Sequence, residues 1–165
     1  MKKESILVLD FGGQYTQLIA RRIRELNVYS EIVPHTITEQ EIRDHNAKGL
    51  VLSGGPASVY ETGAFHSDAS LLKMEIPVLG ICYGMQLIAY QLGGKVAGAE
   101  RKEYGPAKIE VKNDPLFRDL DPQQNVWMNH GDRILECPPG FQSIAVTTNS
   151  PIAAFRDDHG MAKKF

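Results

Sequence analysis

The chain has 165 residues, a formal net charge of −2 and a pI near 6.2. This balance argues against broad binding to nucleic acid or to membrane surfaces, because no face is forced to be basic. The length suits one domain with a sizeable core. Two cysteines do not make a disulfide framework, so we expect Cys82 and Cys137 to be reduced in a cytoplasmic protein.

The first half of the chain alternates short apolar runs with segments of helical periodicity. Strands are predicted at residues 6–10, 29–33, 49–53 and 78–81, and helices at residues 15–26, 38–45, 67–74 and 83–92. Thr38 and Glu41 predict a capping box at the start of the second helix. This alternation is typical of a doubly wound α/β fold with a parallel sheet and right-handed crossovers.

The pattern changes after Lys95, where short β runs follow one another between proline and glycine turns. These runs cover residues 95–99, 107–111, 125–129, 141–147 and 152–156. They predict antiparallel strands added to a mostly parallel central sheet.

The most informative motif is Gly80-Ile81-Cys82-Tyr83-Gly84, between the fourth predicted strand and the helix after it. This layout is typical of a nucleophile elbow, whose side chain projects from a strained backbone beside the N–H groups of a helix N-terminus. A cysteine there, with its pKa lowered by the helix dipole, is expected to attack carbonyl carbon as a thiolate. The alternative is a small buried cysteine at an ordinary strand-to-helix turn, since glycines flank many tight turns.

A second glycine motif, Ser53-Gly54-Gly55-Pro56, follows the third predicted strand. Ligands of an open parallel sheet bind beyond the carboxyl ends of its strands, where this motif and the elbow both lie. If the third and fourth strands are neighbours, an N–H of this loop and the N–H of Tyr83 can converge on one oxygen as an oxyanion hole. By itself, the motif is also typical of a plain glycine turn.

Taken together, the glycine motif and the elbow with its following Met85-Gln86 resemble the class I (triad-type) glutamine amidotransferase domains. Residues 8–22 and 126–132 resemble one branch of that family, which supplies ammonia to an ATP-pyrophosphatase synthetase that converts xanthosine monophosphate to GMP. The resemblance implies one amidotransferase type-1 domain over residues 1–165, with a flavodoxin-like three-layer sandwich as its fold. The ATP-pyrophosphatase domain is absent from these residues.

The resemblance also implies roles for particular residues. Cys82 matches the nucleophile that forms a glutamyl thioester and releases ammonia, while Gly55 and Tyr83 match the backbone donors of the oxyanion hole. Gln86 matches a residue that helps to hold L-glutamine, and Asn129, His130 and Gly131 match a segment lining its pocket. No metal and no cofactor are expected in this domain, because ATP and Mg²⁺ belong to the synthetase domain or subunit that is its partner.

One part of the family pattern is not present in this sequence. The family's catalytic histidine and glutamate lie in a Tyr-Gly-Val-Gln-Phe-His-Pro-Glu stretch, which does not occur in these 165 residues. We therefore expect a domain that is incomplete at its C-terminus, a fragment with at most trace glutaminase activity. Two other functions stay open: a non-catalytic glutamine-binding or regulatory module, and the amidotransferase component of another biosynthetic pathway.

Overall fold

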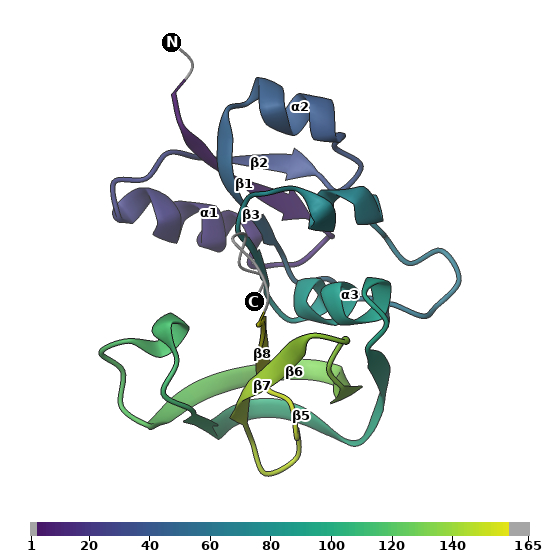
Figure 1. The fold of residues 1–165 in the computed structure, drawn as a ribbon. Coiled ribbons are helices and arrows are strands. Elements are labelled where there is room, and N and C mark those ends of the chain that lie inside the picture. The colour runs from purple at the N-terminus through teal and green to yellow at the C-terminus, as the bar shows by residue number, and fades with distance from the viewer. Residues whose placement is uncertain (1–2, 159–165) are drawn as a thin grey trace. The chain divides into compact units, whose positions relative to one another are not determined.

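The computed structural model describes residues 3–158 and divides into two compact units, the first ending at Ile88 and the second beginning at Ala89 (Figure 1). Helix α3 (Tyr83–Gln91) begins in the first unit and ends in the second. The candidate nucleophile, Cys82, belongs to the first unit.

The first unit contains a four-stranded parallel sheet, as predicted, and its strand order is β2-β1-β3-β4. Its strands are β1 (Ser5–Asp10), β2 (Ser30–Pro34), β3 (Ala47–Leu52) and β4 (Val78–Gly80). The third and fourth strands are direct neighbours, with Leu52 opposite Gly80 at their carboxyl ends. The loops that follow these two strands consequently start side by side.

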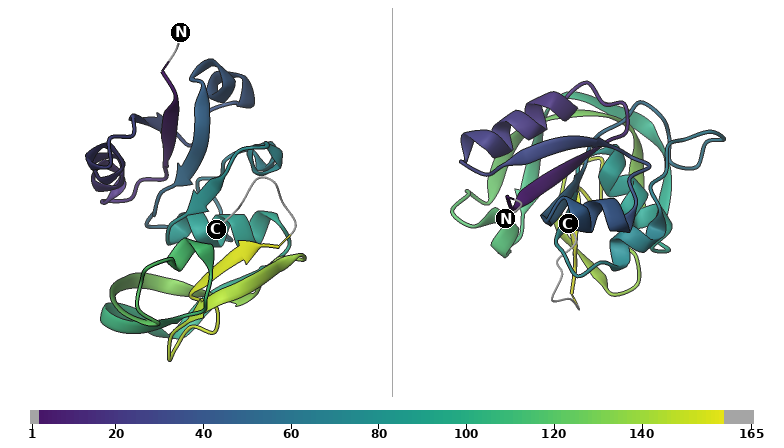
Figure 2. Two further views of the ribbon diagram at one scale, coloured as in Figure 1. Left: turned by 60° about the vertical axis from the view of Figure 1, so that its left-hand side comes forward. Right: turned by 90° about the horizontal axis from the view of Figure 1, so that it is seen from above.

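Two helices lie against this sheet. In the left view of Figure 2, α1 (Thr16–Glu25) lies on one face of the sheet and α2 (Glu39–Asp44) on the other, as right-handed crossovers require. The predicted capping box is confirmed, because the Thr38 hydroxyl accepts from the Glu41 N–H at 3.3 Å and the Glu41 carboxylate accepts from the Thr38 N–H at 2.8 Å.

The helix predicted at residues 67–74 is instead a five-residue 3₁₀ segment, η1 (Ala69–Lys73). The side chain of Asp68 accepts from the Ser70 N–H at 2.8 Å and opens the segment, and Met74 is already extended. The few residues between these limits offer too few hydrogen bonds to offset the cost of starting an α-helix.

The core of the first unit forms around β1. Leu7, Val8 and Leu9 are fully buried, so both faces of this strand are covered. Val8 packs with Ala20 and Val51 in a cluster that partly buried side chains complete: Ile6, Ile19, Ile23, Ile32, Leu79 and Ile81. Each large aliphatic side chain buried in this way contributes on the order of 1.5–3 kcal/mol. The sheet is therefore a firm base for the loops at its carboxyl end.

The second unit contains an antiparallel sheet in the order β6-β5-β7-β8. Its strands are β5 (Lys95–Val111), β6 (Gln123–Glu136), β7 (Phe141–Val146) and β8 (Ala154–Asp157). Within the described residues these strands pair with one another in a sheet of their own.

The two runs predicted at residues 95–99 and 107–111 belong to one long strand, β5. An irregularity between Gly98 and Glu103 absorbs the residues that interrupt the β pattern. Pro106 lies opposite Trp127 of β6, while the pairing of β5 with β7 begins only at Glu110. A proline is tolerated there because the strand has a single neighbour at that point.

Candidate active site

Cys82 occupies the connection between β4 and α3. Its φ is +51°, a left-handed conformation that is uncommon for any residue other than glycine. Its carbonyl accepts from the Gln86 N–H at 3.0 Å, so it forms the first hydrogen bond of the helix. Cys82 is exposed. The predicted strained elbow is thus confirmed, and the alternative of a cysteine hidden at an ordinary turn is wrong.

The two glycines of the elbow allow α3 to approach the sheet closely. A methyl group at Gly84 would overlap the Leu52 carbonyl oxygen and lie 2.6 Å from the Leu52 Cβ. One at Gly80 would lie 2.5 Å from the Met85 nitrogen. The Gly84 N–H also donates to the Ser53 carbonyl at 3.1 Å. The first turn of the helix is therefore fixed against the end of β3.

The segment Ser53-Gly54-Gly55-Pro56, called the glycine loop from here on, lies beside the elbow, as the sequence predicts. A methyl group at Gly54 would lie 3.7 Å from the Cβ of Cys82, and one at Gly55 would lie 3.2 Å from the Cγ of Tyr83. Tyr83 is the first residue of α3, so its N–H is among the helix N-terminal groups without an intrahelical acceptor. The two predicted donors therefore come from adjacent segments, and their convergence on one oxygen stays a prediction.

The loop after β1 supports the glycine loop, a role that the sequence analysis missed. Ser53 is fully buried, and its hydroxyl accepts from the Phe11 N–H at 3.1 Å and donates to the Gly54 carbonyl at 3.0 Å. The carboxylate of Asp10 accepts from the hydroxyl of Thr16 at 3.0 Å and holds the start of the same loop. The sequence did contain a signal for this role, because Asp10 and Ser53 are polar residues at the ends of two apolar strands.

The predicted low pKa of Cys82 is wrong. Although the residue keeps exposed surface, the protein packed around the sulfur desolvates the thiolate and raises the pKa of the Cys82 thiol. The helix N-terminus favours the thiolate by only about 0.3–1 kcal/mol at an exposed site, which desolvation outweighs here. The thiol accordingly needs a proton acceptor before it becomes a strong nucleophile.

We expect the alkylation of Cys82 by iodoacetamide to be slow at pH 7 and to rise about tenfold per pH unit up to pH 9, because only the thiolate reacts and its pKa is raised. Mass spectrometry of a Cys137→Ser variant isolates this reaction. The substitution is needed because the second thiol would also be alkylated with a rate that rises with pH. Burial raises the pKa of the Cys137 thiol too, and the charge of Lys112 partly offsets this rise. A rate that levels off below pH 7 would contradict the assignment of a protonated thiol.

The remaining predicted site residues lie in two different parts of the chain. Gln86 is buried on α3, one turn after Cys82. Asn129, His130 and Gly131 lie on β6 in the second unit, where Asn129 is opposite Tyr104. A shared glutamine pocket stays a prediction. Among the described residues, no group of His, Cys, Asp and Glu side chains is arranged to hold a metal ion.

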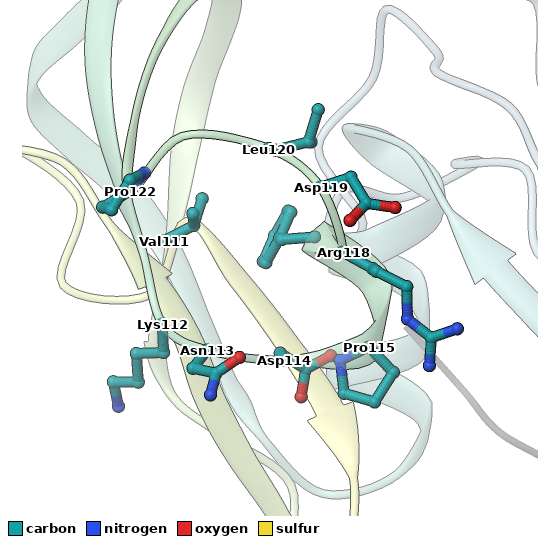
Figure 3. A pocket seen from close by; sticks show the side chains of 10 residues that line it. Val111, Lys112, Asn113, Asp114, Pro115, Arg118, Asp119, Leu120 and Pro122 are labelled. Carbon is teal, nitrogen blue, oxygen red and sulfur yellow. The ribbon is translucent and has the colours of Figure 1, made fainter.

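A hollow of about 670 Å³ lies in the second unit, formed by the end of β5, the 3₁₀ segment η2 (Pro115–Phe117) and the loop after it (Figure 3). Two of its charged side chains, Asp114 and Lys112, have protein partners. Asp114 forms an ion pair with Arg156 and accepts from the Leu116 N–H at 3.0 Å, and the Lys112 ammonium donates to the Ser143 carbonyl at 2.6 Å. We therefore assign no ligand to this hollow.

A cysteine elbow beside a glycine loop on a parallel α/β unit is typical of proteins that transfer acyl groups through a thiol. The family model described as glutamine amidotransferase class-I matches residues 7–162. The chain belongs to the class I glutamine amidotransferase family.

Within this family, the curated relatives of the chain described here share one name. The chain is 55% identical over 152 residues to a protein of Bacillus velezensis named GMP synthase [glutamine-hydrolyzing], a match that covers 92% of this chain and 30% of the relative. It is 54% identical over 157 residues to the protein of the same name from Lactiplantibacillus plantarum, covering 93% of this chain and 30% of the relative. The chain thus spans about 30% of the length of these relatives.

Solved structures agree with this placement. A protein of Thermoplasma acidophilum assigned as a candidate GMP synthase subunit is 32% identical, with a TM-score of 0.86 and coverage of 98% of this chain and 82% of that one. A glutamine amidotransferase of Thermotoga maritima is 22% identical, with a TM-score of 0.78 and coverage of 100% of this chain and 75% of that one. At this level of identity the likeness supports the fold alone.

Proposed function

We propose that this chain is the glutaminase part of a GMP synthase, which hydrolyses L-glutamine and supplies the ammonia for the conversion of xanthosine monophosphate to GMP. The observation that carries the proposal is an exposed cysteine in a left-handed elbow directly beside a glycine loop. The names of the relatives described above support the same assignment.

In the proposed reaction, the sulfur of Cys82 attacks the γ-carboxamide carbon of glutamine. The carbonyl oxygen gains negative charge, which the N–H groups of Gly55 and Tyr83 receive. The C–N bond then breaks, and ammonia leaves with the proton that the thiol has given up. Water hydrolyses the thioester to glutamate and restores the thiol. Gln86 and the segment from Asn129 to Gly131 hold the substrate in this proposal.

The partner in this proposal is an ATP-pyrophosphatase synthetase, which binds ATP and Mg²⁺. Relatives more than three times longer than this chain are consistent with a fused synthetase, and the Thermoplasma acidophilum protein, named as one subunit, is consistent with a separate one. We further propose that both units belong to one amidotransferase domain, since the family model spans them, and that the protein is cytoplasmic. No described helix is long and apolar enough to cross a membrane.

Protection of Cys82 by glutamine tests the binding part of this proposal. L-Glutamine is expected to slow the alkylation of Cys82 by iodoacetamide in the Cys137→Ser variant, because bound substrate covers the sulfur. L-Asparagine, which is one methylene shorter, serves as the matched control and is expected to protect less. Equal rates with and without L-glutamine up to saturating concentrations would contradict a glutamine site at Cys82.

The 165-residue polypeptide itself is expected to show at most trace glutaminase activity. It contains no His-Pro-Glu sequence, and a positioned base and acid contribute roughly 10²- to 10⁴-fold to such reactions. The raised pKa of the Cys82 thiol has the same consequence. Glutamate formation is the measurement, and turnover close to that of a complete glutaminase domain would contradict the expectation. Protection without turnover would favour the alternative of a glutamine-binding module.

A further inference from the structure

A long loop carries one of the two proposed oxyanion donors. Residues 53–68, between β3 and η1, contain no helix or strand. Gly55 lies near the start of this loop, so the position of its N–H depends on how firmly the loop is held. Connections of this length without regular structure have considerable conformational freedom unless side chains restrain them.

Tyr83 connects this loop to the elbow through its side chain. Its phenolic O–H donates to the Phe65 carbonyl at 2.7 Å, a bond between the first residue of α3 and the far end of the loop. The side chain is almost entirely buried, with 2% of its surface exposed. Burial and the charge of Glu61 raise the pKa of Tyr83 to about 12, so the phenol keeps its proton and its role as donor near neutral pH.

The Tyr83 ring also contacts the beginning of the loop. A methyl group at Gly55 would lie 3.2 Å from the Tyr83 Cγ. On the side of the loop after β1, the ring centroid of Phe11 lies 5.5 Å from that of Tyr83. At the other end of the loop, the Phe65 ring stacks on His35 with centroids 4.6 Å apart and an interplanar angle of 17°. Tyr83 therefore touches both ends of the loop, and its hydroxyl is a polar attachment at the far end.

We propose that the hydroxyl of Tyr83 is a positioning group, which holds the Phe65 carbonyl and so keeps the N–H of Gly55 in place beside Cys82. This assignment rests on the proposed glutaminase function. It concerns the side chain of Tyr83, whereas the oxyanion proposal concerns the backbone N–H of the same residue. Loss of the hydroxyl then affects reactions that place negative charge on a carbonyl oxygen, and leaves the intrinsic reactivity of the sulfur unchanged.

Two electrophiles separate these effects in the Cys137→Ser background. A glutamine-like chloromethyl ketone is attacked at its carbonyl, passes through an oxyanion, and ends as a thioether when an S–C bond replaces the C–Cl bond and chloride and a proton leave. With iodoacetamide, the sulfur displaces iodide directly from the CH₂ group, and no comparable charge develops on oxygen. Tyr83→Phe is expected to lower the rate with the chloromethyl ketone about tenfold, part of the 10²- to 10³-fold effect of removing an oxyanion donor. The rate with iodoacetamide is expected to stay within about twofold.

Tyr29→Phe is the matched control, because Tyr29 lies just before β2, at the opposite edge of the sheet from the elbow, and is expected to change neither rate. Hydrogen exchange in residues 54–66 is expected to become faster in Tyr83→Phe and to stay unchanged in Tyr29→Phe. An unchanged ratio of the two rates in Tyr83→Phe, or unchanged exchange in this loop, would overturn the proposal.

If Tyr83→Phe does not fold, Phe65→Leu decides the question, because it removes the stacking on His35 and keeps both the Phe65 carbonyl and the Tyr83 hydroxyl. The hydroxyl still holds the loop in this variant, so both rates are expected to stay within about twofold of the parent, and a tenfold loss of the chloromethyl ketone rate alone would assign the restraint to the ring stacking and overturn the proposal. The proposed function fails in a different way, when the chloromethyl ketone labels Cys82 of the parent protein no faster than a simple chloroketone does.

Discussion

Replacing Cys82 with alanine should abolish covalent labelling by a glutamine-like chloromethyl ketone, from one adduct per chain to none. The reason is geometric: Cys82 is exposed at the elbow and lies beside the Gly54-Gly55 backbone. A reagent bound there has its carbonyl close to the only sulfur of the elbow sequence. Intact-mass spectrometry at pH 8 measures the adduct directly, and peptide mapping gives its position.

Cys137→Ser is the control for this experiment and is expected to keep full labelling. Cys137 lies between β6 and β7, outside both the elbow and the glycine loop. An adduct found mainly on Cys137, or one that persists in Cys82→Ala with unchanged yield, would remove Cys82 from the proposed reaction.

Gly84→Ala should destabilise the protein by about 3 kcal/mol or more, at the upper end of what an overpacked side chain causes. The added methyl group would overlap the Leu52 carbonyl oxygen and lie 2.6 Å from the Leu52 Cβ. Part of this obstacle is backbone of a buried strand, which a change of rotamer does not relieve. Chemical denaturation followed by far-ultraviolet circular dichroism measures the loss in the free energy of unfolding. In a thermal melt the midpoint is expected to be lower by roughly 6–12 °C.

Gly54→Ala is a stringent comparison, because it lies in the neighbouring loop and changes the same atoms. Its methyl group would meet no atom closer than 3.7 Å, so the expected change in the free energy of unfolding is within about 1 kcal/mol. Similar losses for both variants would show that the close approach of α3 to β3 is not what requires glycine at position 84.

The sequence was sufficient to predict the four strands of the first unit and the helices α1, α2 and α3, because their signals are local and agree with one another. Apolar strands such as residues 6–10 end in polar or glycine-rich turns, and the Thr38 capping box marks a helix start without any tertiary information. The elbow was also predictable, since Gly80 and Gly84 flank the one cysteine placed between a strand and a helix.

What could not be predicted depends on contacts between distant residues. The hydrogen bond from the Phe11 N–H to the Ser53 hydroxyl joins positions 42 residues apart, and only the folded sheet brings them together. The raised pKa of the Cys82 thiol has the same origin, because desolvation depends on the surrounding packing whereas the helix dipole follows from local sequence. The continuous strand β5 was divided because Gly105-Pro106 has the composition of a turn.

The raised pKa of the Cys82 thiol has a consequence for its reaction with peroxides. Peroxides convert thiolates to sulfenic acids much faster than they convert thiols, and further oxidation beyond that stage is largely irreversible. A cysteine that is exposed yet mostly un-ionised therefore withstands peroxide better than one with a permanently low pKa. The packing that raises the pKa of the Cys82 thiol is therefore expected to slow its oxidation as well.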